Sequence, residues 1–288
     1  MKPAIIVDST ASISEAVKQL ENVFVVDLTV IFEDGSIAED SSQENEQIVF
    51  FNRLKQEKVL PTTSQPSVGQ YYETLNKIVE EGYDTVFAVH LSKEISGTYQ
   101  SASMVLSEFD HLIDAYCIDS KAAAVVSEAI VDNIVQWIDQ GKSAEEINRL
   151  ALWQADHTDI YLMVENLENL AKGGRLSTTS AVVGNLLKIR PLLYFKEGKI
   201  EVFEKIRTNR RVYQRFYELI GEAIEAYPDG IEIRFAHSLA QTEVEKLSAT
   251  INDMYPGVSI KVNGLSPVIG SHTGLGAIGL AIIPIINK

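Results

Sequence analysis

The chain has 288 residues, enough for two modest domains or one large one with room inside for a ligand. Its 25 Lys and Arg stand against 40 Asp and Glu, and a net charge of -15 disfavours binding to nucleic acid or to an anionic membrane surface. The single cysteine excludes an intrachain disulfide, and no segment approaches the roughly 18 apolar residues of a membrane span. We therefore expect a soluble cytoplasmic protein without stable membrane insertion.

The first half of the chain alternates short apolar runs with longer amphipathic stretches. The runs are rich in β-branched residues and predict buried strands, while the stretches between them predict helices. The expected strands are residues 4–7, 86–90 and 113–118, and the expected helices are residues 44–58, 68–81, 98–109 and 122–140. This alternation indicates a parallel sheet covered on both faces, with its polar turns along one rim, where such sheets bind ligands.

The pattern changes near residue 155, where strand-like segments become more frequent. These segments are residues 160–164, 192–195, 200–203, 231–235, 259–262 and 277–283, with one helix expected over residues 210–227. The second and third of them flank a four-residue turn, as in a hairpin. We predict an α/β fold of two domains: an N-terminal parallel-sheet domain over residues 1–155 and a C-terminal mixed α/β domain over residues 156–288. No linker separates them, so a ligand pocket between or beside them is expected.

Gly274, Gly276 and Gly279 reproduce the glycine spacing of dinucleotide-binding folds. That motif needs a following helix, a return strand and an acidic residue about 20 positions on, whereas this chain ends at Lys288. We interpret the glycines as allowing close approach of a terminal strand to other backbone or to a ligand. The sequence also lacks a phosphate-binding loop, a nucleophile elbow and metal-ligand spacing of its histidines, so no metal site or independent catalysis is expected.

Two hydroxyl-rich turns precede predicted helices. One comprises residues 61–67 and includes Thr63, and the other contains Ser96, Gly97 and Thr98. Hydroxyls and free backbone N–H groups at a helix start can bind an anion, and a glycine there leaves room for a ligand to approach. Helix capping accounts for the same residues, so both interpretations stay open.

Three further polar residues are candidates for a site. His272 lies beside the glycine run, and Arg207 follows a predicted strand and could offer forked donors to a carboxylate. Arg175 follows Gly173 and Gly174, a pattern typical of an exposed loop tip, and is a candidate partner contact in an acidic protein. A structural histidine, an exposed basic turn and a local helix cap are the respective alternatives.

Taken together, these segments resemble the DegV family. Five separated motifs occur in the family's order: Asp8-Ser9-Thr10, Thr63-Ser64-Gln65-Pro66-Ser67, Ser96-Gly97-Thr98-Tyr99, Gly173-Gly174-Arg175-Leu176-Ser177, and His272-Thr273-Gly274 followed by Gly276-Ala277-Ile278-Gly279. The resemblance implies a protein that holds one long-chain fatty acid in a buried pocket and has no other cofactor. It further implies a lipid-binding subunit of fatty acid kinase, which presents the carboxylate to a kinase subunit related to dihydroxyacetone kinases for phosphorylation to an acyl phosphate.

The resemblance also assigns residues to roles. The implied carboxylate ligands are Thr63, Ser96, Arg207 and His272, supported by the turn residues Ser64, Gly97, Thr98, Thr273 and Gly274. Arg175 is the implied docking residue for the kinase, outside the pocket. Two alternatives stay open: a lipid ester hydrolase or acyltransferase with Ser96 as nucleophile and His272 as base, and a lipid sensor that acts without a kinase.

Overall fold

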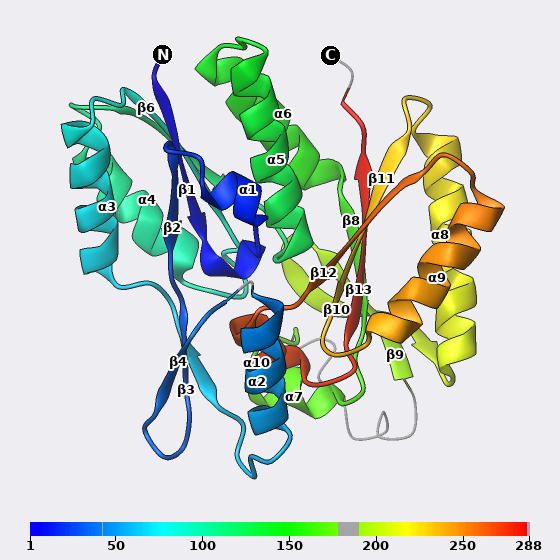
Figure 1. Ribbon diagram of the computed structural model, residues 1–288. Helices are drawn as coiled ribbons and strands as arrows, with labels where there is room; N and C mark the ends of the chain where they lie inside the picture. The colour runs from blue at the N-terminus through cyan, green and yellow to red at the C-terminus, as the bar shows by residue number, and fades with distance from the viewer. Residues whose placement is uncertain (42, 178–189, 287–288) are drawn as a thin grey trace.

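The computed structural model describes residues 1–41, 43–177 and 190–286 and contains three β-sheets (Figure 1). The first sheet has the order β2-β1-β6-β7, and every neighbouring pair is parallel. Its strands are β1 (Pro3–Asp8), β2 (Val23–Val26), β6 (Thr85–His90) and β7 (Asp114–Asp119). The predicted parallel N-terminal sheet is confirmed.

Helices cover both faces of this sheet because its strand residues alternate in direction. In β1, Ala4 and Ile6 pack in one core cluster with α3 (Val68–Glu80) and α4 (Thr98–Glu108). Ile5 and Val7 pack on the other face, where α5 and α6 lie. The bounds of these two helices are Val125–Asp139 for α5 and Ala144–His157 for α6. The predicted helix over residues 122–140 begins three residues late, because Ala124 adopts a φ of 54° and breaks the helical path.

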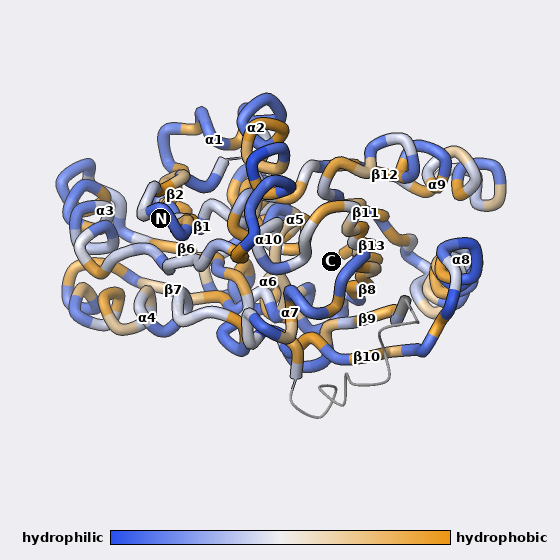
Figure 2. The backbone as a smooth tube through the Cα atoms, turned by 90° about the horizontal axis from the view of Figure 1, so that it is seen from below, coloured by the Kyte–Doolittle hydropathy of each residue, from blue (hydrophilic) through white to orange (hydrophobic). Residues whose placement is uncertain are grey.

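The second sheet is mixed and has the order β10-β9-β8-β13-β11-β12. Its strands are β8 (Asp159–Met163), β9 (Arg190–Lys196), β10 (Lys199–Ile206), β11 (Ile231–His237), β12 (Ser259–Gly264) and β13 (Ile278–Pro284). The amphipathic helices α8 (Asn209–Ala226) and α9 (Gln241–Met254) cover its outer face. In Figure 2 the outward side of α8 is hydrophilic and the strands beside it are largely hydrophobic. The predicted mixed C-terminal sheet and its hairpin are confirmed.

A third, small antiparallel sheet was not predicted. It consists of β3 (Thr29–Ile31), β4 (Ile37–Glu39) and β5 (Thr62–Ser64) in the order β4-β3-β5. Helix α10 (Pro267–Thr273) packs against β3 and β5, and α2 (Glu44–Leu54) and α7 (Leu167–Lys172) pack against α10. The short helices η1 (Ser9–Ala11) and α1 (Glu15–Lys18) follow β1. Helix α10 therefore brings the C-terminal part of the chain onto its N-terminal part.

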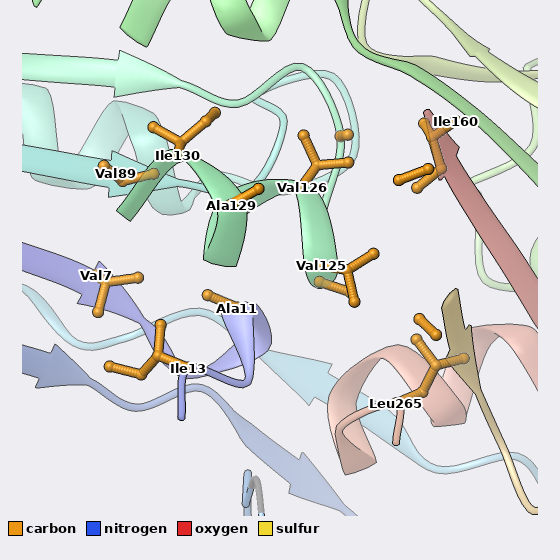
Figure 3. Packing of buried hydrophobic residues seen from close by; sticks show 14 of the residues in the cluster. Val7, Ala11, Ile13, Val89, Val125, Val126, Ala129, Ile130, Ile160 and Leu265 are labelled. Carbon is orange, nitrogen blue, oxygen red and sulfur yellow. The ribbon is translucent and has the colours of Figure 1, made fainter. Parts of the chain in front are cut away.

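One hydrophobic core runs across both halves of the chain. Figure 3 shows Val7 and Ala11 facing Ala129 of α5, with Ile160 and Leu265 from the C-terminal half beyond the end of that helix. Helix α5 is thus a layer shared by the two large sheets. A division between residues 155 and 156 would fall inside α6 and stays a prediction. No helix among the described residues is long and apolar enough to cross a membrane.

Candidate functional site

A cavity lies where the elements from the two halves meet. Its atom-free space is about 780 Å³, including the part open to solvent at its mouth. Its walls are mostly apolar and come from the mixed sheet, from the segments that follow β2 and β6, from the two residues before α5, and from α7 and α10. They include Leu28, Leu91, Ile160, Leu162, Phe195 and Val268. The polar lining residues are Thr63, Ser96, Arg175, His272 and Thr273.

Two of the predicted residues meet directly at the polar part of this cavity. Thr63 lies at the centre of β5, and the alternation along the strand turns its side chain inward while Ser64 is exposed. The Thr63 hydroxyl lies 2.8 Å from Nε2 of His272, which comes from the last turn of α10. Residues 209 positions apart in the sequence are therefore joined by one hydrogen bond.

Gly173 makes room for the His272 ring. A Cβ at position 173 would lie 2.7 Å from His272 Nδ1, closer than real Cβ contacts, and 3.0 Å from the Asn169 carbonyl oxygen. Burial lowers the pKa of His272 to about 4, and the positive charge of Arg175 contributes in the same direction. His272 is therefore a neutral imidazole near pH 7, with one ring nitrogen able to donate and the other able to accept.

The Ser96 turn is held by its own hydrogen bonds. Ser96 Oγ lies 2.8 Å from Oγ1 of the fully buried Thr98, and it also accepts from the Thr98 backbone N–H at 3.3 Å. Thr98 supports Ser96 in this way but does not itself line the cavity. Gly97 allows the two hydroxyl-rich turns to approach each other. A Cβ at position 97 would lie 2.1 Å from Oε1 of Gln65, which belongs to the turn of residues 61–67.

The predicted placement of Arg175 on an exposed loop outside the pocket is wrong. Its side chain is half-buried and lines the cavity. The chain turns back after α7 in a Schellman motif: Gly174, at a φ of 72°, donates to the Ala171 carbonyl, and Arg175 donates its backbone N–H to the Leu170 carbonyl. This reversal directs Arg175 inward rather than away from the protein.

The Arg175 guanidinium is fixed but not neutralised. Its Nε donates to the Ile95 carbonyl at 3.1 Å, and its Nη1 donates to the Gly173 carbonyl at 2.6 Å. Burial lowers the pKa of Arg175, although an arginine stays protonated in proteins. Within the described part of the chain, no carboxylate forms an ion pair with Arg175. A half-buried positive charge is therefore available to an anion in the cavity.

The prediction that Arg207 belongs to the carboxylate site is not supported, because Arg207 is exposed and does not line the cavity. Strand β10 begins beside the cavity at Lys199 and continues to Ile206. At roughly 3.3 Å per residue, Arg207 lies about 23 Å along the strand from the cavity-lining Ile200. The strand continues three residues beyond its predicted end at residue 203, and this extension carries Arg207 away from the site.

Of the other predicted turn residues, Thr273 lines the cavity and Gly274 supports the local structure. Thr273 lines the cavity and donates its hydroxyl to the Ile269 carbonyl at 3.1 Å. Gly274 ends α10 at a φ of 75°, and its carbonyl accepts from the Ser238 hydroxyl at 2.6 Å. Beyond it the chain enters β13 and no further helix follows among the described residues, unlike a dinucleotide-binding motif.

A surface groove, which sequence reasoning missed, adjoins the polar part of the cavity. Its atom-free space is about 1170 Å³, and it shares Thr63, Arg175 and His272 with the cavity lining. It is also lined by Lys58 and Lys172. The chain is acidic overall, so two lysines and an arginine in one groove make a local basic surface.

This geometry suits binding better than catalysis by Ser96. The Ser96 hydroxyl is bonded to Thr98 and the His272 Nε2 to Thr63, so the described residues show no hydrogen bond between the proposed nucleophile and base. No described carboxylate hydrogen-bonds His272 to orient it. The site instead combines apolar walls with two hydroxyls, an imidazole and a guanidinium.

The fold and site define an α/β protein of two large sheets with an apolar cavity that is polar in one part. The chain belongs to the DegV family, whose model, described as one of uncharacterised proteins, matches residues 2–285. A DegV domain-containing protein of Streptococcus pneumoniae is 34% identical over 287 residues, covering 99% of this chain and 100% of that relative.

Solved structures agree with this assignment. A protein of Streptococcus agalactiae, described as a fatty acid binding DegV family protein, matches with a TM-score of 0.90 and 30% identity over 99% of this chain and 100% of its own. DegV of Bacillus subtilis, described as a fatty acid binding protein, matches with a TM-score of 0.89 and 31% identity over the same shares.

Proposed function

We propose that this chain binds one long-chain fatty acid, with the acyl chain in the apolar cavity and the carboxylate among Thr63, Ser96, Arg175 and His272. The unneutralised Arg175 guanidinium at the polar part of an apolar cavity is the observation that carries this proposal. The fatty acid binding described for two solved relatives supports it. The set of ligands differs from the sequence-based prediction in one member, since Arg175 replaces Arg207.

The two parts of the ligand play different energetic roles. Burying some 14 to 16 methylenes at roughly 0.8 kcal/mol each would contribute on the order of 10 kcal/mol, so the acyl chain dominates affinity. A carboxylate inside protein must be surrounded by donors, and the guanidinium, the hydroxyls and the imidazole supply them. The polar groups therefore set the orientation of the ligand.

Protein purified from a bacterial host is expected to carry about one fatty acid per chain, detectable by denaturing mass spectrometry. Thr63→Ala and Ser96→Ala should each weaken oleate binding by roughly 1–3 kcal/mol, because each removes a donor from a buried charge. Ser64→Ala, at the exposed neighbour of Thr63, is the matched control and should bind as the parent does. Absence of stoichiometric lipid, together with no tight uptake of oleate or palmitate, would falsify the proposal.

We further propose that the bound carboxylate is presented to a separate kinase subunit at the groove beside it. In the implied reaction a carboxylate oxygen attacks the γ-phosphorus of a nucleoside triphosphate held by that subunit. The bond from this phosphorus to the bridging oxygen breaks, and acyl phosphate and nucleoside diphosphate result. Lys58 and Lys172 supply positive charge on the side from which a triphosphate would approach, which supports this proposal.

The double variant Lys58→Glu with Lys172→Glu tests presentation separately from binding. We expect a normal lipid content but acyl phosphate formation lowered by roughly 10-fold or more when ATP and a kinase subunit related to dihydroxyacetone kinases are supplied, because like charges repel at the encounter. The double variant Lys55→Glu with Lys246→Glu, at two exposed positions outside the groove, controls for the change in net charge. Unchanged turnover in the double variant would instead favour a lipid sensor that needs no kinase.

A further inference from the structure

The tip of the β9–β10 hairpin forms one wall of the cavity. The strands are joined by the two-residue turn Glu197 and Gly198, both with positive φ, at 50° and 83°. Phe195 and Ile200, one on each strand next to this turn, line the cavity. Any movement of the tip therefore changes how well the cavity is closed.

Ser92, which follows β6, holds this tip against the N-terminal half of the chain. Its side chain is fully buried, and its hydroxyl donates to the Gly198 carbonyl at 2.8 Å. A Cβ at position 198 would lie 2.4 Å from Ser92 Oγ, so glycine is needed there both for the turn conformation and for this contact. The hydroxyl also accepts from the Glu94 backbone N–H at 3.2 Å.

The backbone of Ser92 is bonded to two other walls. Its N–H donates to the Ala122 carbonyl at 2.7 Å, directly before the cavity-lining residues Ala123 and Ala124. Its carbonyl accepts from the N–H groups of Ile95 at 3.1 Å and Ser96 at 3.2 Å. The Ile95 carbonyl in turn accepts from Arg175 Nε, so Ser92 connects the hairpin with the Ser96 turn and with Arg175.

The hairpin has a second attachment on the other side. The Ile200 carbonyl accepts from the Ser177 N–H at 2.9 Å, and Ile200 bridges Leu176 in the segment that carries Arg175. An ion pair of Lys199 with Glu94 at 3.4 Å also joins the hairpin to the segment that follows β6. Its side chains are 54% and 33% exposed, and exposed ion pairs contribute little to stability. Of the two contacts that link the tip to the segment leading into the Ser96 turn, the Ser92 bond is the buried one.

We propose that Ser92 is a positioning residue for lipid retention: its bond to Gly198 keeps the hairpin tip closed over the acyl chain and holds the Ser96 turn at the carboxylate. The inference rests on the proposed fatty acid binding. It assigns to Ser92 control of the rate at which lipid leaves, because a movement of the tip away from the Ser96 turn would widen the cavity and must break this bond.

The first test is the dissociation rate of a fluorescent fatty acid from Ser92→Ala, measured with excess oleate as competitor. We expect dissociation roughly 10-fold faster than in the parent, since the variant leaves the buried Gly198 carbonyl without its donor. Lys199→Gln, which removes only the exposed ion pair of the same hairpin, should dissociate at the parental rate. Equal rates in Ser92→Ala and the parent would overturn the inference.

A double-mutant cycle with Gly198→Ala provides the second test. Gly198→Ala alone should accelerate dissociation, because its methyl group conflicts with the Ser92 hydroxyl. Adding Ser92→Ala removes that conflict, so the double variant should dissociate more slowly than the product of the two single effects predicts. Effects that simply multiply would mean that this contact does not control retention. A parent protein that holds no lipid would instead defeat the proposed function itself, which separates the two failures.

Discussion

Arg175→Gln is expected to weaken fatty acid binding by about 100-fold, or roughly 3 kcal/mol, the largest effect of a single polar substitution in the site. The carboxylate would then lie in a half-buried position without a cation, while the remaining hydroxyls and imidazole can supply only neutral donors. The measurement is the dissociation constant for oleate, together with the lipid content of the purified variant. The oleate affinity of Arg175→Lys should lie between those of the parent and Arg175→Gln, because an ammonium keeps the charge but not the forked geometry.

Lys172→Gln is the matched control. Lys172 lies three residues before Arg175, is exposed, and pairs with Glu168. It should bind lipid as the parent does. A second readout concerns His272, whose pKa is lowered partly by the charge of Arg175. In Arg175→Gln the pKa of His272, followed by NMR titration, should rise. Parental affinity in Arg175→Gln, combined with lost acyl phosphate formation, would return Arg175 to the docking role that its sequence motif implied.

The error over Arg175 shows what the sequence could not convey. Two consecutive glycines are typical of a loop tip, but here each has a different physical role. Gly173 leaves space for a histidine 99 positions further along the chain, and Gly174 adopts the left-handed conformation that ends α7. Asn166 as an N-cap and Gly174 after the helix could have predicted α7 and its reversal. The contact with His272 depends on tertiary structure and has no local signal.

The main strands were predictable because buried strands produce continuous apolar runs of β-branched residues. Strands β3, β4 and β5 have three residues each, too short to produce such a pattern. Thr63 was recognised as a candidate ligand by resemblance, but the reason it points inward is its position at the centre of β5. The cavity walls were not predictable, since residues such as Leu162 and Val268 look like any other core residue in sequence.

Gly279 is the one position of the cavity wall that stands out in the sequence. A glycine in a buried strand has no side chain and leaves space that a substitution can fill. Gly279 lies in β13 on the face that also carries Ala277 and Ala281, and it lines the cavity. A Cβ there would meet nothing closer than the Ala236 carbonyl oxygen at 3.8 Å, an ordinary contact. A larger side chain at position 279 would therefore extend into the space that we assign to the acyl chain.

Gly279→Leu is expected to exclude long acyl chains while the protein remains folded. A leucine side chain occupies the space of about four methylenes, so a chain that fills the cavity should lose roughly 3 kcal/mol of affinity, whereas a 12-carbon chain should lose much less. Mass spectrometry of the co-purified lipid and dissociation constants for laurate and stearate measure this shift. Gly69→Leu, at an exposed glycine of α3 where a Cβ would meet only the Ser67 hydroxyl at 3.7 Å, is the matched control and should leave the preference unchanged. An unaltered chain-length preference in Gly279→Leu would show that the acyl chain does not pass this strand.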